Sequence, residues 1–384
     1  MSPLFSKTYG SRPYIIMCAL FFVVFTFSYL FCYQDNLLAM MQHILSNGQT
    51  HYNRLIGAII ITSLLMLLQL VLYVVTQLNG RLHILTYVPS IVLLTTLTAV
   101  DGNYTSGITI GKWWWIVPLI IILDAIALFY ARQLQDYDSS EGEFCFFSRT
   151  SWINYCGLTA LFMLVMFGAN HQRVLHMRLD VEQCIASQNY KKATATYARA
   201  LQTDSSLTNL RVYALSLSGQ LPERLFEYAL VGGSAVMLPS NPNVHYLLCG
   251  QAPLYQHLGG MFRQKMSTMH YLRFIHQHHL ATKAAHDYLL CAYLMDGNLD
   301  SFVHAIGKYY DLKKPLPKHY REALVLYNHL RSNPYVVYHN SVMEADFTDF
   351  QTLIKQYNDA RQRIAAIRDT YGNTYWAYYY QLKH

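Results

Sequence analysis

Five long stretches of the chain are almost continuously apolar, and the polar residues between them are confined to short segments. The stretches are Tyr14–Cys32, Leu55–Thr76, Leu82–Val100, Trp113–Ala131 and Trp152–Ala169. Each is long enough for an α-helix to cross a hydrocarbon core, which takes roughly 17–25 residues. Five such stretches within 170 residues exceed what a soluble domain of that size could bury as core helices. The pattern therefore predicts a transmembrane domain over residues 1–170, with five spans.

The first stretch follows Lys7 and Arg12, as the apolar part of a signal peptide would. It is longer than the usual apolar region of such a peptide, however, and residues 31–33 offer no pair of small residues for cleavage. We expect it to be retained as a span.

Lysine and arginine in the short connecting segments predict the orientation. With the N-terminus inside, five of them lie on the inner side and two on the outer side. The inner residues are Lys7, Arg12, Arg81, Arg132 and Arg149, and the outer ones are Arg54 and Lys112. The positive-inside rule then predicts a cytoplasmic N-terminus in a cell (inner) membrane, and an odd number of spans places the tail outside, in the periplasm of a Gram-negative cell. Arg173 and Arg178 follow the last span closely and argue for the opposite orientation.

Charge changes sharply after the last span. The whole chain is 53% hydrophobic and 13% charged, which is about half the usual charged share of a soluble protein. Up to Ala169 there are seven basic and seven acidic residues, whereas the rest holds 22 basic and 15 acidic ones, so the net charge of +7 belongs to the tail. These values exclude a single soluble domain and a disordered chain, and seven cysteines are too few for a disulfide-dense module.

The tail, residues 171–384, shows helical periodicity. Its clearest stretch places Tyr190, Ala193, Tyr197, Ala200 and Leu201 at spacings of three and four, on one face of an expected helix. Small alanines between tyrosines at these intervals resemble the second helix of a tetratricopeptide repeat. The resemblance implies an array of stacked helix pairs whose surface binds proteins.

The rest of the tail follows this repeat pattern less closely. Met177, Asp180 and Val181 stand where the first helix of such a repeat usually has Trp, Leu and Gly, and weaker echoes occur at 215–228, 292–309 and 316–327. An irregular helical bundle would show the same apolar positions at helical spacing, and it remains an alternative. No run alternates long enough to predict a sheet.

The predicted fold class is all-α: a bundle of five transmembrane helices followed by a soluble, tetratricopeptide-like helical-repeat domain over residues 171–384. The whole design is similar to multi-pass bacterial membrane proteins of families described only as domains of unknown function. That likeness implies an architecture and no activity.

Asp124 is the one ionisable carboxyl, amine or guanidinium group inside a predicted span. Such a group marks an ion, proton or substrate path, or forms a hydrogen bond across a helix interface. We expect the partner in the second case to be Thr62, Ser63, Gln69 or Tyr155.

The tail holds 14 of the 17 histidines, densest at His276, His278 and His279. A metal site is conceivable there, but no paired Cys-x-x-Cys, His-Glu-x-x-His or neighbouring carboxylate accompanies them, so solvated histidines are the preferred interpretation. Three tail cysteines, Cys184, Cys249 and Cys291, would allow one disulfide or simply fill helix interfaces. The sequence predicts no catalytic residue, no cofactor and no metal site.

Residues 371–380 hold five tyrosines and a tryptophan. We expect them to cap the last repeat, although contact with the membrane interface or with a partner would suit them too.

The leading functional hypothesis is a non-catalytic membrane scaffold whose helical tail binds a protein partner, in cell-envelope assembly or maintenance. Its partners are then the lipid bilayer and that protein, and not nucleic acid. The alternative is a transporter component or integral-membrane enzyme that works through Asp124.

Overall fold

A computed structural model describes residues 13–78, 80–103, 107–109, 111–135, 149–262 and 264–384 of the 384-residue chain. Lys7 and Arg12, used above for the orientation, lie outside these residues. Helices make up most of the described part, and its strands are one pair of three residues each, so the all-helical class is confirmed. The chain divides into two compact units, residues 1–172 and 173–384, which are described separately.

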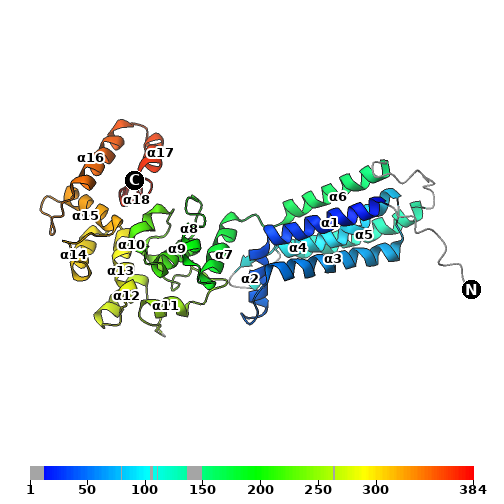
Figure 1. Cartoon of the computed structure of the whole chain (residues 1–384), viewed down its shortest axis with the longest axis horizontal. Coiled ribbons are helices and arrows are strands. Elements are labelled where there is room, and N and C mark those ends of the chain that lie inside the picture. The colour runs from blue at the N-terminus through cyan, green and yellow to red at the C-terminus, as the bar shows by residue number, and fades with distance from the viewer. Residues whose placement is uncertain (1–12, 79, 104–106, 110, 136–148, 263) are drawn as a thin grey trace, which may run out of the picture. The chain divides into compact units, whose positions relative to one another are not determined.

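The first unit is a bundle of long apolar helices (Figure 1). In chain order its elements are α1 (Pro13–Cys32), α2 (Asp35–Leu45), α3 (Arg54–Thr76), the 3₁₀ helix η1 (Gly80–Tyr87), α4 (Val88–Thr98), β1 (Asp101–Asn103), β2 (Gly107–Thr109), α5 (Trp113–Gln135) and α6 (Arg149–Gly168). Five helical segments are long and apolar enough to cross a membrane: Tyr14–Cys32, Arg54–Thr76, Gly80–Thr98, Trp113–Leu134 and Arg149–Gly168. The five predicted apolar helices are therefore present.

α5 shows how these helices divide their surface. Asp124 and Ala131 are buried, and Val117, Ile120, Ala127 and Leu128 are half-buried. These positions recur at spacings of three and four, and their stripe faces the side on which α4 and η1 contact the helix. Most of its remaining apolar side chains are exposed, for example Leu119 at 57%. A helix that covers one narrow stripe and exposes apolar groups elsewhere is compatible with an apolar surround such as a bilayer.

The third apolar helix differs from the expected uniform helix. Its first eight residues form η1, and α4 begins only at Val88. Pro89 explains the change, because it has no N–H for the carbonyl of residue 85 and its ring clashes with that carbonyl in an α-helix. The Thr86 hydroxyl donates to the His83 carbonyl at 2.8 Å and stabilises the tighter turn.

The sequence did not predict two short elements of the first unit. α2 is an amphipathic helix that buries Leu37, Leu38 and Met40 between the first two apolar helices. β1 and β2 pair antiparallel, with Asp101 opposite Thr109.

The second unit is built of shorter helices that surround a core rich in tyrosine and leucine. In chain order they are α7 (Arg173–Ala186), α8 (Tyr190–Ala195), α9 (Ser205–Leu217), α10 (Leu221–Arg224), η2 (Leu225–Glu227), η3 (Gly233–Met237), α11 (Ala252–Leu258), α12 (Thr268–Gln277), α13 (Lys283–Met295), α14 (Leu299–Tyr309), α15 (Lys318–Leu330), α16 (Ser341–Gln356), α17 (Ala360–Tyr371) and α18 (Tyr375–Lys383).

Four of these helices, α7, α9, α12 and α13, end in the same turn. Each is followed by a residue with left-handed backbone: Gln188, Gly219, His279 and Gly297. Its N–H donates to the carbonyl three positions back, and the next N–H donates to the carbonyl five positions back. These two bonds define the Schellman motif, which satisfies the last carbonyls of a helix and lets the chain reverse within three residues.

The expected helix face over residues 190–201 is wrong. Tyr190 and Ala193 lie in α8, but that helix ends at Ala195, so Tyr197, Ala200 and Leu201 lie beyond it. Tyr197 and Leu201 are 45% and 66% exposed rather than packed against a neighbouring helix.

Local hydrogen bonds explain the early end of α8. The Thr196 hydroxyl donates to the Lys192 carbonyl at 2.7 Å, a side-chain bond that competes with the helix, and Thr196 itself is extended. Tyr197 then has left-handed backbone, at φ +52°. Its hydroxyl donates to Asp180 at 2.7 Å and its carbonyl accepts from Arg211 at 3.1 Å, so tertiary contacts hold it outside the helix.

The C-terminal aromatic residues are part of the core of the second unit. Tyr375 and Trp376 of α18 are buried. The Tyr375 N–H donates to the Glu322 carboxylate at 2.7 Å, and the Trp376 indole donates to the Glu322 carbonyl at 2.8 Å. The Tyr375 ring also packs edge-on against Phe226, with ring centres 4.9 Å apart. α18 is thereby anchored to α15 and η2.

Candidate functional site

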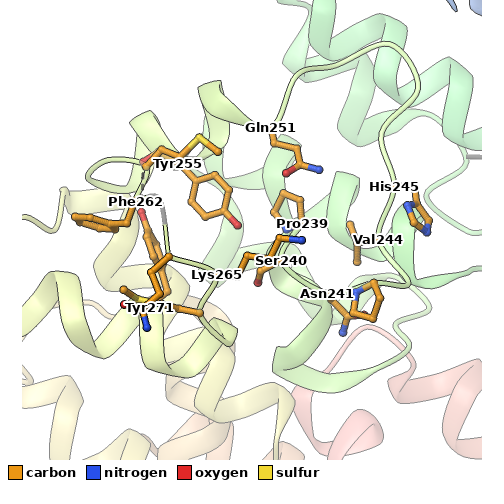
Figure 2. A pocket seen from close by; sticks show the side chains of 14 residues that line it. Pro239, Ser240, Asn241, Val244, His245, Gln251, Tyr255, Phe262, Lys265 and Tyr271 are labelled. Carbon is orange, nitrogen blue, oxygen red and sulfur yellow. Dashed lines mark hydrogen bonds between the residues drawn. The ribbon is translucent and has the colours of Figure 1, made fainter. Parts of the chain in front are cut away.

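The second unit contains a pocket of about 370 Å³ between the loop 239–245 and α11 (Figure 2). Residues 261, 262 and 264–266, which precede α12, form another wall. Tyr255, Phe262 and Tyr271 form the aromatic side of the pocket. The centre of the Tyr271 ring lies 5.3 Å from that of Tyr255 and 6.0 Å from that of Phe262. Rings that pack against one another in this way form a rigid apolar wall.

Prolines and an asparagine shape the loop. Pro239 and Pro242 keep it out of a helix, because neither has an N–H and each fixes φ. The Asn241 side chain closes the turn, donating to the Ala235 carbonyl at 3.1 Å and accepting the Asn243 N–H at 2.9 Å. Such a turn holds its shape through its own side chain.

Two glycines bring the chain back across the pocket after α11. Gly259 and Gly260 have φ of +151° and +136°, and both donate to the Tyr255 carbonyl, at 3.0 and 2.7 Å. A Cβ on Gly259 would lie 2.4 Å from the Leu280 carbonyl oxygen, so only glycine fits there. The Tyr271 hydroxyl fixes the turn by donating to the Gly260 carbonyl at 2.7 Å.

Side chains of α7 and α9 form hydrogen bonds with the backbone of the loop 239–245 and hold it in place. The Arg178 guanidinium donates to the His245 carbonyl at 2.9 Å and pairs with Asp204 at 3.3 Å. The Ser206 hydroxyl accepts the His245 N–H at 3.0 Å and donates to the Asn243 carbonyl at 3.3 Å. Arg178, considered above as a charge near the membrane, is only 5% exposed and has a structural role in this unit.

Glu182 fixes the chain just after the loop. It is fully buried, and one carboxylate oxygen accepts the three consecutive backbone N–H groups of residues 247–249, at 2.8, 2.6 and 3.2 Å. Burial raises the pKa of Glu182, while these N–H groups and Arg178 act in the opposite direction. The carboxyl therefore replaces the hydrogen bonds that this coil segment lacks.

The polar groups of the pocket are cationic or neutral. Lys265 and His245 line it, and none of its described lining residues is acidic. The side chains of Lys265, Gln251 and Gln264 form no hydrogen bond or ion pair with any described residue. An aromatic wall beside unpaired amide and ammonium groups suits binding of a ligand that combines apolar and polar parts.

The part of the chain from α11 onward matches a known family. Residues 248–383 match the model of a family of unknown function, DUF6057. The match includes the aromatic wall of the pocket and Lys265, whereas the loop 239–245 precedes it. Neither the curated proteins nor the solved structures contain a match to this chain.

Asp124, the carboxyl singled out from the sequence, is 7% exposed in the first unit. It makes no hydrogen bond or ion pair within the described residues. The prediction that it bonds to Thr62, Ser63, Gln69 or Tyr155 is therefore wrong for the described residues. Gln69 instead donates to the Thr86 hydroxyl at 3.1 Å. The role of Asp124 in an ion path stays a prediction.

The sequence analysis missed His83 in η1. Its ring is fully buried and meets the rings of Tyr14, Tyr73 and Tyr87 nearly at right angles, with centres 5.9, 5.3 and 5.6 Å apart. The signal was present, since His83 is the one histidine inside the five apolar stretches.

The histidine-rich stretch is solvated in part, since His278 and His279 are exposed, as expected, whereas His276 is half-buried. His279 is the left-handed residue after α12, and the His276 Nδ1–H donates to the Leu272 carbonyl, 2.6 Å away. The ring of His276 lies 5.3 Å from that of His286, which stacks on Tyr309 at 4.3 Å. Among the described residues no group of three or more His, Cys, Asp or Glu could hold a metal, and Cys184, Cys249 and Cys291 are free thiols.

This histidine pair predicts acid sensitivity. Burial lowers the pKa of both His276 and His286 below 6.5, so below about pH 6.5 the unfolded chain binds more protons than the folded one. The contribution of the two neutral histidines to the free energy of unfolding is complete above that pH. It is lost as the pH falls through their lowered pKa values. Thermal unfolding of the full chain in detergent, at about pH 7.5 and about pH 5.5, should show a smaller acid-induced loss for His286→Gln than for the parent.

His270→Gln, at an exposed position on α12, is the matched control and should leave the acid-induced loss unchanged. An equal loss in the parent and in His286→Gln would contradict the assignment.

His319 and Glu322 look like an acid–base pair but are fully engaged. The His319 Nδ1 lies 2.8 Å from the Glu322 carboxylate, which also accepts the Tyr375 N–H. The His319 Nε2 accepts the Phe226 N–H at 3.3 Å. Both side chains are buried, so the pair joins η2, α15 and α18 and has no free position for a substrate.

Proposed function

We propose that this chain is a non-catalytic, multi-pass membrane protein whose tail binds a segment of a partner polypeptide in the pocket beside Tyr255. The pocket carries the proposal, because its aromatic wall and unpaired Gln251, Gln264 and Lys265 side chains are available to a ligand. Apolar rings with a few polar groups are the usual composition of a recognition site.

The membrane part of the proposal rests on the five apolar helices of the first unit. Their exposed apolar side chains, such as those of α5, fit a bilayer as surround. We place them in a bacterial inner membrane with the N-terminus in the cytoplasm and the tail in the periplasm, as the loop charges favour. The burial of Arg178 supports this orientation, because its charge is used within the tail.

The shared turns after α7, α9, α12 and α13 support a helical-repeat origin for the tail. In such arrays the binding surface is built from several helix pairs and carries no preset chemistry. A scaffold role in assembly or maintenance of the cell envelope follows from a binding tail that is tethered to the membrane.

A photo-crosslinker tests the proposal. With p-benzoylphenylalanine at Gln264 of the full chain in its native membrane, we expect discrete polypeptide adducts. Gln251→Trp should remove them by filling the pocket. Gln251 is exposed and its side chain makes no cap bond to α11, so this change should not disturb the fold.

The same probe at Lys308, exposed on α14, is the control and should give none of these adducts. Identical adducts at both positions, or adducts that persist with Gln251→Trp, would refute binding in the pocket.

A further inference from the structure

We propose that the pocket selects an acidic polypeptide segment, in which an Asp or Glu side chain is held by Lys265 and a neighbouring apolar side chain packs on the aromatic wall. This inference rests on the proposed function and adds the chemistry of the ligand. It depends on the charges, amide groups and dimensions of the pocket.

The described lining of the pocket carries positive charge without a negative charge to balance it. Lys265 makes no ion pair with the described residues, and the described lining residues include no Asp or Glu that could neutralise it. Figure 2 shows Lys265 among the side chains that line the pocket. Lys265 is exposed, so its attraction to a carboxylate is that of a surface charge and acts together with the apolar contacts beside it.

The unpaired amides favour a peptide over a simple anion. Gln251 and Gln264 each offer one carbonyl and one NH₂ group, which match the alternating donors and acceptors of an extended backbone. The volume of about 370 Å³ is at the lower end for ligand sites and is sufficient for a few side chains. Tyr255, Phe262 and Tyr271 provide the surface for an apolar one.

The experiment uses the full chain reconstituted in nanodiscs and a random linear peptide library displayed on phage without a free C-terminus. We expect the selected peptides to combine Asp or Glu with an aromatic or large aliphatic residue. Selection on Lys265→Met should lose the acidic preference, and selection on Lys265→Glu should replace it by Lys or Arg. Lys308→Glu, exposed on α14, should leave the preference unchanged.

Synthetic peptides then measure the effect. Binding of a selected peptide should weaken about two- to fivefold when its acid is changed to the amide, or when the protein carries Lys265→Met. Amidating the C-terminus should have no such effect. If amidation weakens binding and the side-chain change does not, the site recognises chain termini and the inference is overturned.

Two further outcomes separate the inference from the proposed function. Peptides that bind the parent chain and not Gln251→Trp, but show no acidic preference, would overturn the inference and leave the proposed function standing. If no peptide distinguishes the parent from Gln251→Trp, both fail.

Discussion

Replacing Trp376 by alanine should destabilise the second unit by about 3–5 kcal/mol, the usual cost of emptying a buried tryptophan site. The side chain is 2% exposed, and its ring lies 5.2 Å from Phe347 and 5.9 Å from Phe350. Its indole N–H also donates to the Glu322 carbonyl, so truncation removes packing and a hydrogen bond together. Hydrogen exchange of the full chain in detergent, read by mass spectrometry, should accelerate over α15, α16 and α18.

Two comparison variants separate these contributions. Trp376→Phe keeps an aromatic ring and loses the hydrogen bond, so it should cost less than the alanine variant. Leu382→Ala lies on the same helix but at a side chain that is 45% exposed, and it should cost about 1 kcal/mol or less. If Trp376→Ala accelerates exchange no more than Leu382→Ala, α18 does not stabilise the unit in the way described here.

The long apolar helices could be predicted because their signal is local and continuous. Each stretch contains its own evidence, and no distant contact is needed to recognise it. The departure at η1 also has a local cause, Pro89, but its consequence for the preceding turn depends on tertiary bonds such as that of Asn154 to the Gly80 carbonyl.

The prediction of one helix face over residues 190–201 failed because distant contacts, not local ones, decide the structure there. The spacing of Tyr and Ala is that of a helix, yet Asp180 and Arg211 bind Tyr197 from other helices and hold it in a left-handed conformation. The helix propensity of one segment contains no information on hydrogen bonds to residues that are 14 and 17 positions away in sequence.

The pocket could not be predicted because its parts look ordinary separately. Arg178 and Glu182 appear in the sequence as two charges on an amphipathic helix, and only the fold brings them to a loop more than 60 residues later. Lys265 lies in a coil segment without a motif. The site is assembled from segments that no periodicity connects.

Replacing Glu182 by alanine should have the second large effect. Three buried backbone N–H groups, those of residues 247–249, would lose their acceptor, and each unsatisfied donor costs about 1–3 kcal/mol. The opening free energy of this segment should fall by about 3 kcal/mol or more, which corresponds to exchange faster by more than about 100-fold. Hydrogen exchange of peptides covering residues 244–250 in the full chain measures this directly.

The matched variants are Glu182→Gln and Glu227→Ala. Glutamine keeps an oxygen for the three N–H groups and should restore most of the protection, although its NH₂ group then lacks an acceptor. Glu227 forms a partly exposed ion pair with Arg224 at 2.8 Å, and its loss should cost about 1 kcal/mol or less. Equal exchange in the two alanine variants would contradict the role assigned to Glu182.

The same variants connect the buried carboxyl to the pocket. Glu182 lies outside the pocket lining and holds residues 247–249, between the lining residues His245 and Gln251, so its effect on ligand capture passes through this segment. Glu182→Ala should therefore abolish the Gln264 crosslink while Glu182→Gln retains it. A crosslink that survives in Glu182→Ala, although exchange at residues 247–249 has accelerated, would show that the ligand contacts α11 and α12 without needing the loop.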